Sequence, residues 1–86
     1  MDLDDAVRVL KAAEANVPRA EQRAEERARQ IKAEARARVE RARQALHEAI
    51  VTEYGRGARQ VDLVKRTGYT RETIRRILRA AGVEPE

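Results

Sequence analysis

Residues 58–81 read ARQVDLVKRTGYTRETIRRILRAA, and this stretch decides the fold. Apolar residues lie on each side of a central Gly68, namely Val61, Leu63 and Val64 before it and Ile74, Ile77 and Leu78 after it. Spacings of three and four residues are typical of one helix face. Thr70 is the expected N-cap of the second helix, with its hydroxyl accepting from the amide of Thr73. The stretch therefore predicts two short helices across a turn that contains glycine.

The residues just before this stretch predict one more helix in the same domain. Its apolar positions are Leu46, Ile50, Val51 and Tyr54. Gly55-Arg56-Gly57 follows, and a glycine beyond the last turn commonly supplies the left-handed residue that ends a helix. Isolated aromatic residues at apolar positions pack in a core first, so we expect Tyr54 and Tyr69 to be core residues. Residues 45–86 are thus predicted to form a three-helix domain.

Residues 60–79 resemble the twenty-residue signature of bacterial helix-turn-helix DNA-binding proteins. Leu63 and Val64 take the apolar pair of its first helix, and Gly68 takes the turn glycine. Residues 70–78 look like the recognition helix of resolvase- and invertase-type DNA-binding domains and of small bacterial transcriptional regulators. Val64 departs from the pattern, because the family usually has alanine there. The resemblance covers residues 45–82 and implies that the helix after the turn reads double-stranded DNA in the major groove.

The chemistry of the second short helix agrees with that expectation. If its apolar residues are buried, its charged residues face outward. Arginine donates two hydrogen bonds to guanine, and glutamate accepts one from cytosine. The candidate base contacts are Arg71, Glu72, Arg75 and Arg76. Candidates for the DNA backbone, chosen for charge or for a place near a helix start, are Arg59, Gln60, Lys65, Arg66, Thr70, Thr73 and Arg79.

Composition restricts the function classes further. The chain has 86 residues, a net charge of +4 and no cysteine. Residues 56–79 carry eight basic residues against Asp62 and Glu72, which favours a polyanionic partner. A chain this short has too small a core for a deep substrate pocket, and it lacks thiolate ligands. We expect no enzyme, no cofactor and no metal. Because no apolar run approaches a membrane span, we expect no membrane partner and a cytoplasmic, nucleoid-associated protein.

The N-terminal residues are rich in alanine and charged residues and poor in large apolar ones. Leu3, Val7 and Leu10 predict a short helix over 3–15, which Asn16-Val17-Pro18 is expected to interrupt. A long helix is predicted from Pro18 to Tyr54. Its coiled-coil-like seam marks residues 1–44 as a self-association arm, although a solvated charged helix is the alternative. The seam residues are Ala24, Ala28, Ile31, Ala35, Val39 and Ala42.

The sequence therefore predicts an all-α protein, with a long N-terminal helical arm followed by a three-helix helix-turn-helix domain. We expect sequence-specific binding of double-stranded DNA as a homodimer, in the role of a transcriptional regulator or a plasmid or phage accessory factor. One such unit covers little DNA, so useful specificity needs two half-sites. Two alternatives stay open. One is an adaptor whose N-terminal helices bind another protein, and the other is a nucleoid architectural protein that binds DNA broadly.

Overall fold

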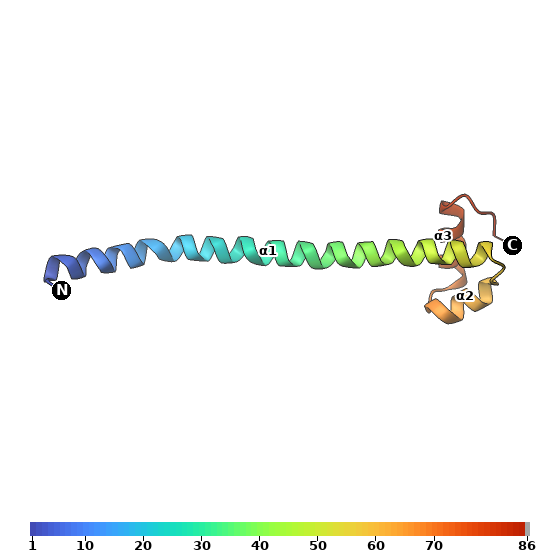
Figure 1. Cartoon of the computed structure of the whole chain (residues 1–86), viewed down its shortest axis with the longest axis horizontal. Coiled ribbons are helices and arrows are strands. Elements are labelled where there is room, and N and C mark those ends of the chain that lie inside the picture. Colours follow the sequence, from blue (N-terminus) through green and yellow to red (C-terminus); the bar gives the residue numbers. More distant parts are fainter. Residues whose placement is uncertain (86) are drawn as a thin grey trace. The chain divides into compact units, whose positions relative to one another are not determined.

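The computed structural model describes residues 1–85, and all regular structure in them is helical (Figure 1). Helix α1 spans Leu3–Gly55, α2 spans Gln60–Thr67 and α3 spans Arg71–Ala80. The chain divides into two units, Met1–Ala37 and Arg38–Glu86, with the boundary inside α1. These elements confirm the predicted all-α class, in which a long N-terminal helix precedes two short ones.

The predicted interruption at Asn16-Val17-Pro18 is wrong, because α1 continues through Pro18. A proline inside a helix removes one backbone hydrogen bond and costs about 3 kcal/mol. Residues on both sides are mostly alanine, arginine and glutamate, which are strong helix formers. Glu14, whose carbonyl loses its partner, is exposed, so water can satisfy that oxygen. The high helix propensity of the flanking residues therefore outweighs the cost of Pro18 within α1.

The first unit is a single stretch of helix with exposed side chains. At its start the Asp2 carboxylate accepts from the backbone N–H of Asp5 at 2.8 Å, and Asp5 forms an ion pair with Arg8. Carboxylates at a helix N-terminus are favoured by the helix dipole. Leu10 is 60% exposed and Ile31 is 55% exposed. The apolar residues of this unit thus form no core of their own.

No helix within residues 1–85 combines the length and the apolar character needed to cross a membrane.

In the second unit the end of α1 meets α2 and α3 (Figure 1). Apolar side chains of the three helices form a core there. The buried residues are Ile50, Leu63, Ile74, Ile77 and Leu78. Partly buried side chains complete this core, namely Leu46, Val51, Tyr54, Ala58, Val64, Tyr69 and Val83. The expectation that Tyr54 and Tyr69 are core residues is confirmed.

The apolar face of α2 differs from the predicted one. Val61 is 51% exposed, so its expected place in the core is wrong. The inner face is formed by Gln60, Leu63, Val64 and Thr67, which recur at the helical spacing of three and four residues. Val61 lies one residue beyond Gln60, about 100° around the helix, and so it faces away from the core.

Candidate nucleic-acid interface

The turn between α2 and α3 is held by its own backbone and hydroxyl groups. Gly68 has φ +77° and donates its N–H to the Val64 carbonyl at 2.9 Å. The Thr67 hydroxyl donates to the Leu63 carbonyl at 2.6 Å and accepts from the Tyr69 N–H at 3.1 Å. A left-handed residue of this kind closes a helix C-terminus and is best supplied by glycine. The turn therefore sets the direction in which α3 leaves α2.

Helix α3 begins with the side-chain cap that the sequence predicts. The Thr70 hydroxyl oxygen accepts from the Thr73 N–H at 3.1 Å, and this hydroxyl donates to Thr73 Oγ1 at 3.0 Å. Arg76 Nη2 also donates to Thr73 Oγ1, at 3.3 Å. The N-cap prediction for Thr70 is confirmed. Both threonine hydroxyls are already engaged at the helix start, where they were expected to meet phosphates.

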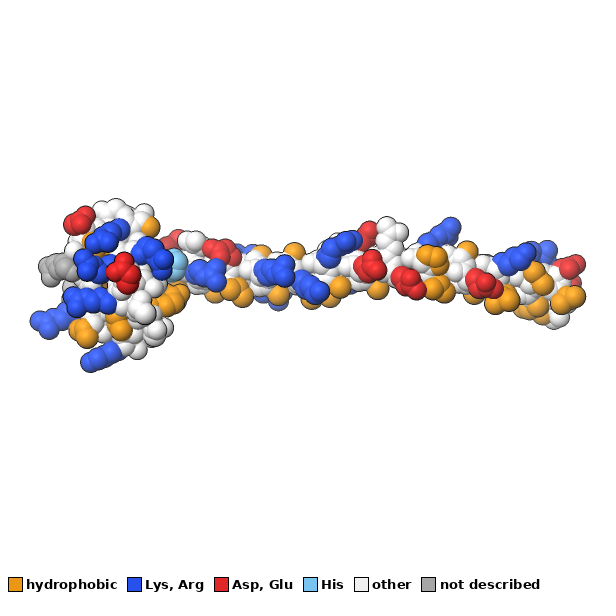
Figure 2. Space-filling model, turned by 180° about the vertical axis from the view of Figure 1, so that it is seen from behind, with side chains coloured by type: hydrophobic (Ala, Val, Ile, Leu, Met, Phe, Trp, Pro, Cys, Tyr) orange, Lys and Arg blue, Asp and Glu red, His pale blue; other side chains and the backbone are white. Residues whose placement is uncertain are grey.

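The solvent side of α3 is strongly basic. Arg71, Glu72, Arg76 and Arg79 are exposed, and the last three of these lie on the face opposite the core residues of α3. Within residues 1–85, the ion pairs of the chain involve other arginines, at positions 8, 43, 56 and 66. Figure 2 shows lysine and arginine side chains over much of the visible face of this unit. The arginines of α3 thus form no ion pair with a carboxylate among residues 1–85.

Arg71 and Gln60 join the starts of the two short helices. Gln60 is only 6% exposed, and its Oε1 accepts from Arg71 Nε at 3.4 Å. A buried amide that is hydrogen-bonded in this way has a structural role, while the expected contact between Gln60 and the DNA backbone stays a prediction. Arg71 stays exposed but is oriented by Gln60, which leaves its terminal nitrogens to reach a ligand.

Arg75 differs from the outward position that the sequence predicts. Its side chain is half-buried, and its Nε lies inside the protein without a hydrogen-bond partner among the described residues. On a helix whose inner face is Ile74, Ile77 and Leu78, Arg75 lies on the flank. The most outward charged side chains of α3 are therefore those of Glu72, Arg76 and Arg79.

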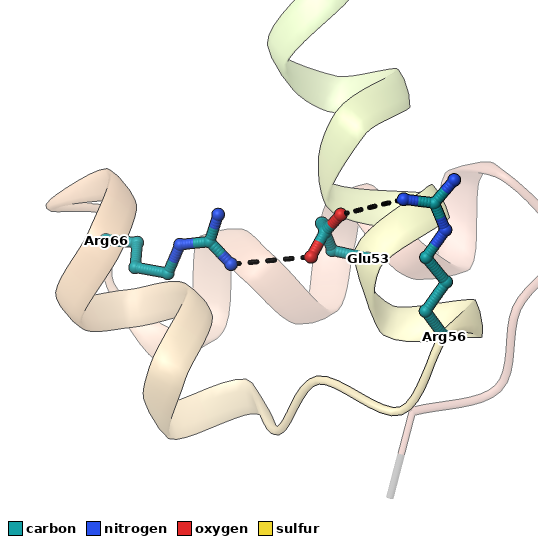
Figure 3. Close-up of polar contacts among 3 residues, drawn as sticks. All are labelled: Glu53, Arg56 and Arg66. Carbon is teal, nitrogen blue, oxygen red and sulfur yellow. Dashed lines mark hydrogen bonds and ion pairs between the residues drawn. The ribbon is translucent and has the colours of Figure 1, made fainter.

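Three basic residues of α2 and its N-cap remain at the surface. Arg59, the N-cap residue, and Lys65 are exposed, and so is Arg66. Arg66 Nη1 lies 3.4 Å from Glu53 Oε2, while Glu53 Oε1 lies 3.4 Å from Arg56 Nη1 (Figure 3). Glu53 therefore links the end of α1 to α2. In the sequence, the only sign of this role is that Glu53 lies three residues before Arg56.

A hollow of about 640 Å³ lies at the start of α2. Its lining includes Arg59, Arg71 and Gln60 together with Tyr54 and Val61. The first backbone N–H groups of a helix have no partner within the helix, and they favour anions. Two arginines beside such a helix start make a polar hollow that suits a phosphate group.

The exposed basic residues among the predicted DNA contacts thus lie on α3, at the start of α2 and in the last turn of α2. The expected self-association residues all lie on exposed parts of α1: Ala24, Ala28, Ile31 and Ala35 in the first unit, and Val39 and Ala42 at the start of the second.

Comparison of the chain with known protein families, curated proteins and solved structures finds no match.

Proposed function

We propose that this protein binds double-stranded DNA through the second unit, with α3 placed in the major groove. One observation carries the proposal: α3 is a capped helix with a buried apolar face, while its outer side presents arginines that form no ion pair with a described carboxylate. A major groove admits a helix of this width, and arginine recognises guanine through two hydrogen bonds. Arg76 and Glu72 are the proposed base contacts of the outer face, and Arg71 adds one from the first turn.

The residues around α2 support a contact with the DNA backbone. Arg59 and Arg71 flank the hollow at the start of α2, and Lys65 and Arg66 are exposed farther along the same helix. Contacts to phosphates position a protein on DNA without reading its sequence. In the proposed complex these residues hold the duplex, while α3 reads it.

We further propose that the protein acts as a dimer in transcription or as an accessory factor of a plasmid or phage. A single small unit buries a limited area on DNA, and pairing two units on two half-sites raises specificity. The exposed apolar residues of the first unit support self-association, because they have no core of their own. The role is binding and not catalysis.

The experiment is a selection of preferred sites from random duplexes, followed by titration of selected and random DNA at several salt concentrations. Arg76→Ala is expected to cost about 1–3 kcal/mol on the selected site and to relax the base preference at one position. Lys65→Ala is expected to weaken all sequences alike and to reduce the salt slope by about one. Arg23→Ala, which removes the same charge from the first unit, is the matched control and should leave binding close to that of the unchanged protein.

The outcome separates the proposed function from its alternatives. If the protein fails to bind any duplex at low salt, the proposal is wrong. A small ratio of specific to random affinity at every salt concentration would favour a broadly binding architectural protein. Equal effects of Arg76→Ala and Lys65→Ala on specificity would contradict the division into base and backbone contacts.

The apolar surface of the first unit also supports a second candidate, an adaptor that binds another protein through residues 1–37 and uses DNA only as an anchor. Self-association of the intact protein separates the two. A protein that stays monomeric, both alone and on a duplex with two sites, has its apolar face free for a different protein.

A further inference from the structure

The first unit carries a strict seven-residue repeat on one face of α1. Apolar residues recur along this face at intervals of three, four or seven residues, namely Leu3, Val7, Leu10, Val17, Ala24, Ala28, Ile31 and Ala35. The remaining positions of the repeat are Glu14 and Glu21. All ten of these residues are exposed, and Figure 2 shows hydrophobic side chains along this helix. A strict seven-residue repeat is the pattern of a helix that winds around another helix.

Side-chain size along this face is uneven, and the unevenness indicates an orientation. The larger residues, such as Leu3 and Leu10, lie near the N-terminus, while alanines predominate from Ala24 onward. Helices pack at one spacing along their length when large side chains face small ones. An antiparallel pair achieves this in two of its three outer layers, because Leu3 then faces Ala35 of a second copy and Leu10 faces Ala28, while Val7 faces Ile31 in the layer between them.

The charges that flank the face fit the same antiparallel alignment. The flanking positions on one side are Asp4, Lys11, Pro18, Glu25 and Lys32. With Leu3 opposite Ala35, Asp4 of one copy meets Lys32 of the other, and Lys11 meets Glu25. The two Pro18 residues meet at the centre. By symmetry each pair occurs twice, so every charged contact on this side joins opposite charges.

A parallel pair in register would instead bring like charges together. Arg27 of one copy would flank Lys32 of the other, and this like-charge contact would occur twice. Glu14 and Glu21 would each face their own copy inside the seam. In the antiparallel alignment Glu14 faces Ala24 and Glu21 faces Val17, so no two carboxylates oppose each other. Flanking charges and charged seam residues are the features that select orientation in paired helices.

We propose that residues 1–37 pair with the same residues of a second copy in antiparallel orientation, with Val7 opposite Ile31. The proposal rests on the self-association put forward above and does not depend on DNA binding. The two copies of the second unit leave the paired segment at opposite ends, which lie about 50 Å apart at 1.5 Å per residue.

Crosslinking of the full-length chain tests the orientation directly. The chain has no cysteine, so Val7→Cys and Ile31→Cys each introduce a single thiol. A short bismaleimide should join the two variants when they are mixed, because positions 7 and 31 are opposite in the antiparallel pair. Each variant alone should stay uncrosslinked, since equal positions then lie more than about 30 Å apart along the axis.

If each variant crosslinks on its own and the mixture gives no additional product, the pair is parallel and the inference is overturned. No crosslink in any sample would overturn it as well. No DNA is present in this assay, so its failure leaves the DNA-binding proposal intact, and loss of DNA binding leaves the crosslinking result intact.

A charge exchange gives a second, independent reading by sedimentation. Lys32→Glu turns two attractive contacts with Asp4 into repulsive ones, and we expect the dimer to weaken about tenfold. Adding Asp4→Lys to the same chain should restore the dimer. Arg23→Glu makes an equal charge change at a position that the repeat places away from the seam, and its effect should be small. Failure of the double variant to recover, or equal weakening by Arg23→Glu, would contradict the proposed register.

Discussion

Replacing Gly68 by alanine tests whether the turn is held by backbone conformation alone. Gly68 has φ +77°, and a side-chain carbon added there would meet no atom within 4 Å. The substitution therefore introduces no clash. A non-glycine residue in the left-handed region costs about 1–2 kcal/mol. Alanine also lowers the conformational entropy of the unfolded chain, which favours the folded state by about 0.4–1 kcal/mol. We therefore expect a net destabilisation of about 1 kcal/mol.

That loss is large for a domain of this size, and it corresponds to a fall in Tm of about 4–8 °C. Thermal unfolding should be followed by near-ultraviolet circular dichroism. The chain has two tyrosines and no tryptophan, and Tyr54 and Tyr69 both pack against the core of the second unit. Their signal therefore reports this unit, whereas the far-ultraviolet signal is dominated by α1.

Two control variants separate the backbone effect from a general loss of glycine. Gly68→Asn should lose less stability than Gly68→Ala, because asparagine tolerates the left-handed region. Gly55→Ala lies within α1 and is without a positive φ, so it should raise Tm through better helix propensity. An unchanged Tm for Gly68→Ala, or a greater loss for Gly68→Asn, would refute the reasoning.

Two further predictions concern the core and the ion pairs of the second unit. Ile74 is 0% exposed, so Ile74→Ala should lower the free energy of unfolding in urea by about 2–5 kcal/mol. Val61→Ala, at an exposed position, should change it by no more than about 0.5 kcal/mol, and similar values for the two variants would contradict the assignment of the core. Glu53→Gln removes the negative charge that pairs with Arg56 and Arg66, whose side chains are largely exposed. It should cost about 0–1 kcal/mol, less at high salt; a larger, salt-independent loss would show a role beyond these ion pairs.

The helices and the cap of α3 were predictable because they depend on residues close in sequence. The Thr70 cap involves a partner three residues away, and Gly68 closes onto Val64 four residues before it. Local bonds of this kind can be recognised from residue type and spacing. Pro18 is the local signal that failed, because a single unfavourable residue was outweighed by the helix formers around it.

The individual roles of the basic residues were less predictable. Arg71, Arg75 and Arg76 look equivalent in the sequence, yet one is oriented by Gln60, one is half-buried and one is exposed. These differences depend on how the neighbouring helices pack on α3, since that packing decides which flank of α3 is covered. A pattern of spacing gives the face of a helix but not the width of the area that its neighbour covers.

The sequence by itself determined the helical class, the place of the turn, the core face of α3 and the concentration of positive charge in residues 56–79. Each of these follows from residue type, spacing or charge within a short window. The tertiary structure alone decided that Gln60 is buried, that Val61 is exposed and that Glu53 contacts Arg66, thirteen residues away in the chain. Burial and long-range ion pairs depend on which surfaces meet, and that is settled only when separate helices pack together.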